Sequence, residues 1–278
     1  MGHLIGDEYL RDHLLEVAKN IVLAIKKAPA ITGRTQIETE IVYGDDIVPI
    51  IEVLEPVSRG QRYIQWDYET IKSCHEKGET PVIIGIGAKV DNSNLGWNCG
   101  ACGFPTCREY NAYAKDCSGG GPLGGPSCNW KLLDYAIACD WACASAWQYK
   151  VDNRIMGSVG FAMAALGMLP DSNVKLGLAL GPARDMVYYN REEMNRKITY
   201  EEEKTEMLKS ASTMFTCFSG NGNPMYKTKD RWWTQPERMD MGFSQSAVEE
   251  YEKIVRQQVP EIVMKHVEKI AARYKKKK

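Results

Sequence analysis

Apolar and polar positions alternate along the first half of the chain in patterns typical of helices and strands. Leucine, valine and isoleucine recur every three or four residues over Tyr9–Lys27 and predict an amphipathic helix. Ala28-Pro29 ends this helix, because the residue before a proline avoids helical backbone angles. The alternating residues 38–43 predict an exposed strand, and the β-branched run Pro81–Gly87 predicts a central strand.

Two more helices are predicted between these strands. The first covers Ile47–Leu54, with Asp45 or Asp46 as its N-cap, and the second covers Asp67–Lys77. Together with the flanking strands, they give an order of helix, strand, two helices and strand.

The second half of the chain begins with strongly apolar segments. Trp130–Tyr149 is apolar on nearly every side, which predicts a fully buried helix. Ile155–Met168 predicts a helix rich in small residues, with Asp152 or Asn153 as its N-cap. Strands are expected over 174–180 and, as the last strand, over 186–189. The pattern as a whole indicates an α+β or three-layer fold.

The last ninety residues differ in character and are expected to form a mainly helical C-terminal extension, residues 191–278, on a domain of residues 1–190. Residues 191–213 are charged and helical in pattern. Residues 217–241 are irregular and contain Trp232 and Trp233, which suit an interface, a lid or packing against the main domain. A long amphipathic helix from Ser244 passes Pro260 and ends in four lysines.

Charge and composition narrow the class of protein. The 278 residues carry a formal net charge of −1, which argues against a broad nucleic-acid-binding surface. The apolar runs are shorter than the roughly 18 residues that would span a bilayer. The N-terminus lacks the basic and apolar regions of a signal peptide, so a cytoplasmic location is expected.

Cysteine spacing supplies the candidate chemistry. Cys99, Cys102 and Cys107 lie within nine residues, separated by glycines that let a short loop turn towards a metal. In a reducing compartment, metal binding is the better explanation for such a group than disulfides. Cys128, beyond a glycine-rich loop, is favoured as the fourth ligand over Cys117.

The segment around Cys107 also predicts a helix. Thr106 and Glu109 have the spacing of a capping box, so a helix is expected from Cys107 towards Lys115, with its positive end at the metal site. An iron–sulfur cluster is the favoured occupant, with zinc and a thiol-redox site as alternatives. Cys139 and Cys143 share one helix face and are expected to be packing residues, although they could approach the metal.

Longer patterns resemble a known family. The run Cys99-Gly-Ala-Cys102-Gly-Phe-Pro-Thr-Cys107 resembles the iron–sulfur domain of several redox proteins. Across residues 10–190 the chain resembles an uncharacterised family of ferredoxin-domain-containing proteins, through the segments Gly125–Cys128, Leu133–Ala138 and Val151–Met156. This resemblance implies a [4Fe-4S] cluster on Cys99, Cys102, Cys107 and Cys128, inserted at residues 95–130. It implies no reaction.

A second resemblance concerns the scaffold. Three segments are similar to parts of the nitroreductase fold: Ala28-Pro29, the strand Pro81–Ile86 and the segment Ala165–Met168. This resemblance implies an α+β, three-layer mixed sheet, a homodimer and bound FMN. The usual arginine- and serine-rich phosphate site is missing, which leaves Thr32 and Arg34 as candidate FMN-binding residues.

These observations leave three hypotheses about function and do not decide whether the protein is an enzyme. The favoured one is an iron–sulfur protein that transfers electrons to a redox partner protein or a bound flavin. The alternatives are an FMN-dependent reductase of a small organic substrate and a non-redox module in which zinc or a cluster stabilises a partner-binding loop. A homodimer or a subunit of a larger complex is expected, without nucleic acid or a membrane span.

Overall fold

The computed structural model describes residues 8–60, 62–116, 126–183, 185–189 and 245–275. The elements, in chain order, are α1 (Glu8–Lys27), β1 (Ile37–Val42), the 3-10 helix η1 (Gly44–Ile47), α2 (Val48–Ser58), α3 (Arg62–Glu76), β2 (Val82–Ala88), α4 (Cys107–Asp116), α5 (Asn129–Gln148), β3 (Asn153–Met156), α6 (Gly157–Ala165), β4 (Val174–Leu180) and α9 (Gln245–Lys275).

The described strands form one four-stranded sheet in the order β1-β2-β4-β3. All of its pairings are antiparallel, so the prediction of a mixed sheet is wrong. The connection between β1 and β2 is consistent with their antiparallel pairing. Two helices, α2 and α3, lie between these strands and pack against each other, whereas a parallel pair is usually joined by a single crossover helix.

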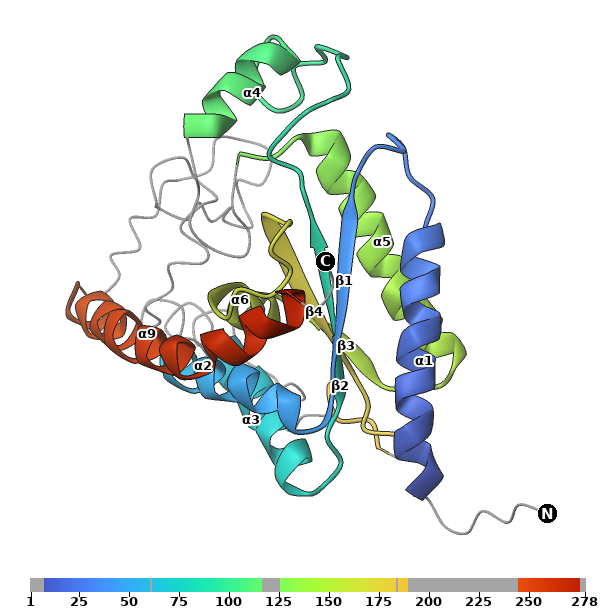
Figure 1. Cartoon of the computed structure of the whole chain (residues 1–278), viewed down its shortest axis with the longest axis vertical. Coiled ribbons are helices and arrows are strands. Elements are labelled where there is room, and N and C mark those ends of the chain that lie inside the picture. Colours follow the sequence, from blue (N-terminus) through green and yellow to red (C-terminus); the bar gives the residue numbers. More distant parts are fainter. Residues whose placement is uncertain (1–7, 61, 117–125, 184, 190–244, 276–278) are drawn as a thin grey trace, which may run out of the picture.

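Helices cover both faces of this sheet, as the prediction of three layers requires (Figure 1). On one face, α1 and α5 pack against alternate residues of β2, including Ile84 and Ile86. On the other face, α2, α3, α6 and α9 pack around Ile83 and Ala179. The alternation of residues between two apolar layers explains why β2 is buried along its whole length. The likeness to nitroreductases stays a prediction.

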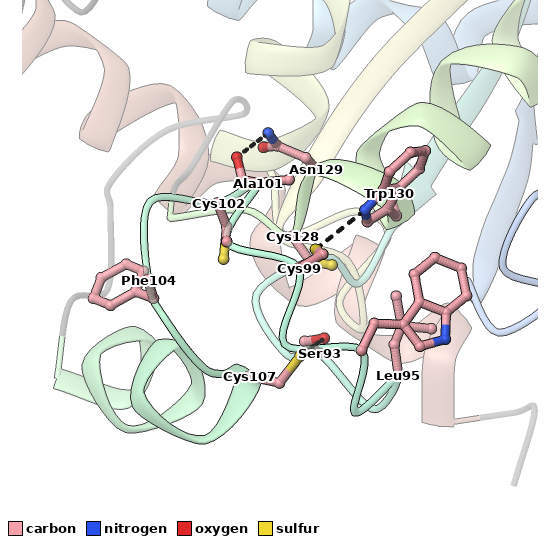
Figure 2. A pocket seen from close by; sticks show the side chains of 12 residues that line it. Ser93, Leu95, Cys99, Ala101, Cys102, Phe104, Cys107, Cys128, Asn129 and Trp130 are labelled. Atoms are coloured by element: carbon pink, nitrogen blue, oxygen red, sulfur yellow. Dashed lines mark hydrogen bonds between the residues drawn. The ribbon is translucent and has the colours of Figure 1, made fainter.

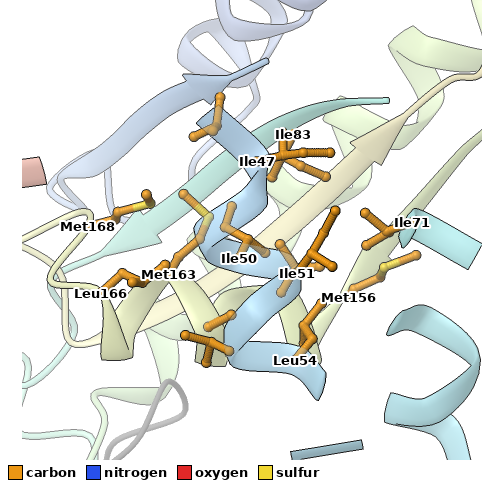
Figure 3. Packing of buried hydrophobic residues seen from close by; sticks show 14 of the residues in the cluster. Ile47, Ile50, Ile51, Leu54, Ile71, Ile83, Met156, Met163, Leu166 and Met168 are labelled. Atoms are coloured by element: carbon orange, nitrogen blue, oxygen red, sulfur yellow. The ribbon is translucent and has the colours of Figure 1, made fainter. Parts of the chain in front are cut away.

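The second of these cores is built around α2. Figure 3 shows Ile50 and Ile51 of this helix with Met163 and Met168 on one side and Met156 of β3 on the other. Close contact between α6 and β4 depends on Gly160, where an added Cβ would lie 2.2 Å from the carbonyl oxygen of Lys175. The predicted small-residue helix therefore packs closely on the sheet, although it begins later than expected.

The chain around residue 153 departs from the sequence-based prediction. Asn153–Met156 forms the edge strand β3 rather than the start of a helix, and it pairs with β4. Asp152 is therefore not a helix cap. Its carboxylate accepts the backbone N–H groups of Val187 at 2.5 Å and Tyr188 at 3.0 Å.

The same two hydrogen bonds explain why the prediction of a strand over residues 186–189 is wrong. Residues 186–189 were expected to form the last strand, but they lie outside the sheet. Because the N–H groups of Val187 and Tyr188 are bound to a side chain, they do not take part in a strand ladder. Tyr188 is fully buried in the core beside α2.

Helix α5 is not buried on every side, contrary to the prediction. Leu133, Trp141 and Trp147 are 43%, 42% and 39% exposed, while Tyr135, Ala138 and Ala142 pack against the sheet and α1. The apolar pattern alone could not show that only half of the helix is covered. None of the helices within the described ranges combines the length and apolar character needed to cross a bilayer.

Helix α9 packs across α2 and adds Val259 and Ile270 to the core on that face. Polar side-chain contacts hold it there: Arg273 lies 2.5 Å from Asp46, and Lys265 and His266 lie 2.9 and 2.6 Å from Glu52. Asp46 therefore binds α9 and does not cap α2, whose N-cap has no side-chain hydrogen bond. The predictions for residues 191–213 and 217–241, including Trp232 and Trp233, lie outside the described residues.

We expect the docking of α9 to weaken in acid. The hydrogen bond from Arg273 lowers the pKa of Asp46; at Glu52, burial raises the pKa but the contacts with His266 and Lys265 outweigh it. Carboxylates with lowered pKa values stabilise the fold above their ordinary pKa, near 4, and lose that contribution as the pH falls through the folded value. Asp46→Asn should cost about 0.5 kcal/mol of unfolding free energy at pH 7, measured with urea, and less as the pH falls below the ordinary carboxyl pKa.

The neighbouring Asp45 is exposed and provides the matched control. Asp45→Asn should leave the urea midpoint unchanged at pH 7 and at the lower pH. Equal losses in the two variants at pH 7 would contradict the assignment of Asp46 to the α9 contact.

Candidate metal centre

The cysteine segment begins and ends beside Val90, two residues after the end of β2. The carbonyl oxygen of Val90 accepts the backbone N–H of Cys128 at 2.8 Å. The Tyr110 hydroxyl lies 2.8 Å from the same oxygen and 3.1 Å from the carbonyl oxygen of Pro126. Tyr110 is fully buried, so these contacts fix α4 against both ends of the segment.

The following residues add side-chain contacts to this junction. Asn111 of α4 accepts the Ser93 N–H at 2.7 Å and donates to the Ser93 carbonyl at 2.9 Å. Lys131 of α5 donates its ammonium to the Asn92 carbonyl at 2.9 Å. Residues 90–93 therefore connect the end of β2 to both helices that flank the cysteines, and we call them the junction segment.

The loop between the junction segment and α4 needs backbone angles that few residues adopt. Asn98, Gly100 and Gly103 have positive φ values of 48°, 71° and 86°. The expectation that the two glycines permit tight turns in this loop is confirmed. An added Cβ at either glycine would meet no neighbouring atom, so the requirement is conformational rather than steric crowding.

Helix α4 begins at Cys107, as predicted, and Thr106 caps it. The Thr106 hydroxyl accepts the Glu109 N–H at 3.2 Å, and the Asn98 side chain accepts the Cys107 N–H at 2.9 Å. Two of the first backbone donors are thus already satisfied. The helix still directs the positive end of its dipole towards the cysteines.

All four predicted ligands line a single pocket. Cys99, Cys102 and Cys107 enter it from the loop and the start of α4, and Cys128 enters from the residue before α5 (Figure 2). Their exposure differs: Cys99 is exposed, Cys102 and Cys107 are partly buried, and Cys128 is buried. Cys117, the competing fourth ligand, lies outside the described residues.

Two of the sulfurs receive hydrogen bonds. The Trp130 indole N–H donates to Cys99 Sγ at 3.2 Å, and the Ser93 hydroxyl donates to Cys107 Sγ at 3.3 Å. The Ser93 hydrogen bond, with backbone N–H groups around residues 96–98, lowers the pKa of Cys107 below that of an ordinary thiol. Donors of this kind stabilise the thiolate, which is the form that binds metals.

The residues present fit an iron–sulfur cluster. The pocket lining offers four sulfurs and, among the described residues, no histidine or carboxylate, which is a soft donor set suited to iron–sulfur clusters or zinc. Within the described ranges, no three ligand side chains converge as a single metal ion requires.

Cys139 and Cys143 do not line this pocket. Burial raises the pKa of the Cys139 thiol to about 12 and that of Cys143 to about 11. Both stay protonated near neutral pH and pack in the core beside α1, as the sequence analysis favoured.

The two candidate FMN-binding residues lie in the loop between α1 and β1, where a carboxylate already binds. Asp134 of α5, 3% exposed, accepts the Ile31 N–H at 2.6 Å and the hydroxyls of Thr32 and Thr35 at 2.5 and 2.8 Å. Arg34 donates to the Asn94 carbonyl at 2.7 Å. A flavin phosphate would have to compete with Asp134 for these donors, and FMN binding at Thr32 and Arg34 stays a prediction.

Sequence reasoning missed the residues that hold the cysteines in place. Tyr110 and Asn111 have no spacing that distinguishes them from other polar residues of an exposed helix. Lys131 did carry a signal, because it is the one basic residue in the sequence of α5, which is mostly apolar. A lone cation in such a helix calls for a buried partner.

One of the comparisons with known proteins suggests an iron–sulfur cluster. Residues 124–191 match a family described as "uncharacterized protein containing a ferredoxin domain (DUF2148)". An uncharacterized protein of Archaeoglobus fulgidus is 29% identical over 189 residues, which is 68% of this chain and 97% of the archaeal protein. No solved structure matches the chain. A ferredoxin domain suggests an iron–sulfur cluster and hints at electron transfer. The matched range contains Cys128 but not the loop that carries the other three cysteines.

Asp134 should be a large contributor to stability because it satisfies several backbone and hydroxyl donors at once. Asp134→Ala removes the shared acceptor of these partly buried donors and should lower the unfolding free energy by about 2 kcal/mol, measured by urea denaturation. Asp140→Ala, at an exposed position of the same helix, should change it by less than about 0.5 kcal/mol. Similar values for the two variants would show that Asp134 does not organise the loop.

Proposed function

We propose that the protein is an iron–sulfur electron carrier whose Cys99, Cys102, Cys107 and Cys128 hold a [4Fe-4S] cluster. The observation that carries this proposal is the pocket lined by all four thiols, although Cys128 is separated from the others by a long stretch of chain. The match to a ferredoxin-domain family also supports it, and the matched residues include Cys128 but not the loop with the other three cysteines.

A bound cluster would supply one-electron chemistry, and the chain would determine its access to solvent and partners. Cys128 and Tyr110 close the inner side, where both are at most 5% exposed. On the outer side, Cys99 is exposed and Trp97 is 49% exposed, with its ring edge-on to Trp130 at 5.9 Å between centroids. We infer that electrons enter and leave at the Cys99 side.

A redox partner protein would dock at this outer side. Weak electron-transfer complexes bury little surface, so an exposed aromatic rim beside the ligand is sufficient for a transient contact. The donor would lose one electron and the acceptor would gain one, without any bond being made or broken in the carrier. A bound flavin remains the other possible acceptor.

The first test is metal analysis of the ligand variants. Protein purified without oxygen should contain about four iron and four sulfide per chain and should be brown. Cys128→Ala and Cys102→Ala should lose most of the iron, because three thiolates hold the cluster poorly. Cys139→Ala is the matched control and should keep the full content, because Cys139 packs away from the pocket.

The same preparation distinguishes the alternative functions. A colourless protein with one zinc per chain would contradict the proposal and favour the metal-stabilised binding module. Stoichiometric FMN in place of iron would favour the flavin-dependent reductase. Unchanged iron in Cys128→Ala would refute the assignment of the fourth ligand.

A substitution of Trp130 tests the hydrogen bond that its indole N–H donates to Cys99 Sγ. Trp130→Phe keeps an aromatic ring but removes the N–H that donates to Cys99 Sγ. Hydrogen bonds to ligand sulfurs stabilise the more negative, reduced state, so the variant should have a lower midpoint potential in a redox titration with wild-type iron content. Trp141→Phe, on the exposed part of α5, should leave the potential unchanged.

A further inference from the structure

Lys131 is a buried cation beside the proposed cluster ligand Cys128. It lies in the first turn of α5, three residues after Cys128, and only 4% of the residue is exposed. Its ammonium donates to the Asn92 carbonyl at 2.9 Å. Lysine is seldom buried unless a negative charge compensates it, so its position calls for an explanation.

The charges that face Lys131 come from three segments. Burial lowers the pKa of its ammonium, while Cys128 and Asp91, and to a lesser extent Asp134, raise it. Lys89 opposes them from the end of β2. Asp91 also has a buried oxygen, Oδ1, for which the described residues provide no hydrogen-bond partner. Next to Cys128, but outside the lining of the pocket, the fold therefore holds one buried cation and one carboxylate whose buried oxygen has no partner among the described residues.

We propose that Lys131 is the counter-charge of the cluster and raises its reduction potential. This inference rests on the proposed function. A single electron supplied by a redox partner adds one negative charge at the site. A buried cation attracts the reduced state more strongly than the oxidised state, and the attraction is large because little water screens it. Asp91, close to the same cation, acts in the opposite direction.

If Lys131 had only a structural role, its charge would not affect the reduction potential of the cluster. In that case the hydrogen bond to Asn92 would be its only task, and a neutral donor could replace it. Lys131→Gln keeps an amide donor but removes the charge, Lys131→Met removes both, and Lys131→Arg keeps the charge. These three variants separate the effect of charge from that of the hydrogen bond.

The experiment is a redox titration of the full-length, cluster-loaded protein, followed by its visible absorbance and electron paramagnetic resonance, with iron and sulfide measured in each sample. At the wild-type midpoint, Lys131→Gln and Lys131→Met should reduce the ratio of reduced to oxidised cluster at least tenfold, which is about 59 mV for one electron. Lys131→Arg should stay within threefold of the wild type. Lys115→Gln, at an exposed position of α4, is the control and should shift the ratio less than twofold.

Replacing Asp91 should shift the reduction potential in the opposite direction. Asp91→Asn should increase the reduced fraction at the wild-type midpoint, and it decides the question if the Lys131 variants lose their cluster. Wild-type potentials in Lys131→Gln or, where that variant is empty, in Asp91→Asn would overturn the inference while the electron-carrier proposal stands. Wild-type protein without iron and sulfide would instead refute the proposed function and the inference with it.

Discussion

The hydrogen bond from the Cys128 N–H to the Val90 carbonyl is the constraint on which the candidate site depends. The chain leaves the sheet at Val90, forms the cysteine loop and α4, and returns to the same carbonyl before α5 begins. Without this closure, Cys128 would not face cysteines that lie more than twenty positions earlier. Tyr110 reinforces the closure from α4, and because it is fully buried its hydroxyl has these backbone carbonyls as its acceptors.

The closure also gives the pocket two unlike sides. The inner side is formed by Cys128, and the buried Lys131 and the partly buried Asp91 lie next to it at the junction with the sheet, where charges are less screened by water. The outer side contains Cys99 and Trp97 and is open to solvent. An electron carrier benefits from this division, because contact with a partner at one side leaves the electrostatic control at the other side unchanged.

The sequence predicted the parts of the fold that depend on local patterns. The periodicity of α1 and the β-branched run of β2 led to nearly correct bounds, and Thr106 marked the start of α4. The errors arose where a distant partner decides the outcome. Val187 and Tyr188 look like a strand, but the carboxylate of Asp152 binds their N–H groups. Local spacing carries no information about such a partner.

The candidate site shows the same division between local and distant information. Glycine and cysteine spacing identifies the loop, because tight turns and thiolate ligands impose requirements that few other residues meet. The side chains that orient the ligands are ordinary residues, Tyr110, Asn111 and Lys131, whose roles depend on the junction segment meeting two helices. Only a three-dimensional arrangement reveals that role.

Helix α5 links these features and raises the question of what covers its outer face. Its first turn carries Lys131 and Asp134, and its inner face packs on the sheet. Its outer face exposes Leu133, Trp141 and Trp147 to solvent. Apolar side chains aligned on one helix face are typical of surfaces that bind another protein. A homodimer or larger complex stays a prediction, and any contact at this face would act on the same helix that carries Lys131 in its first turn.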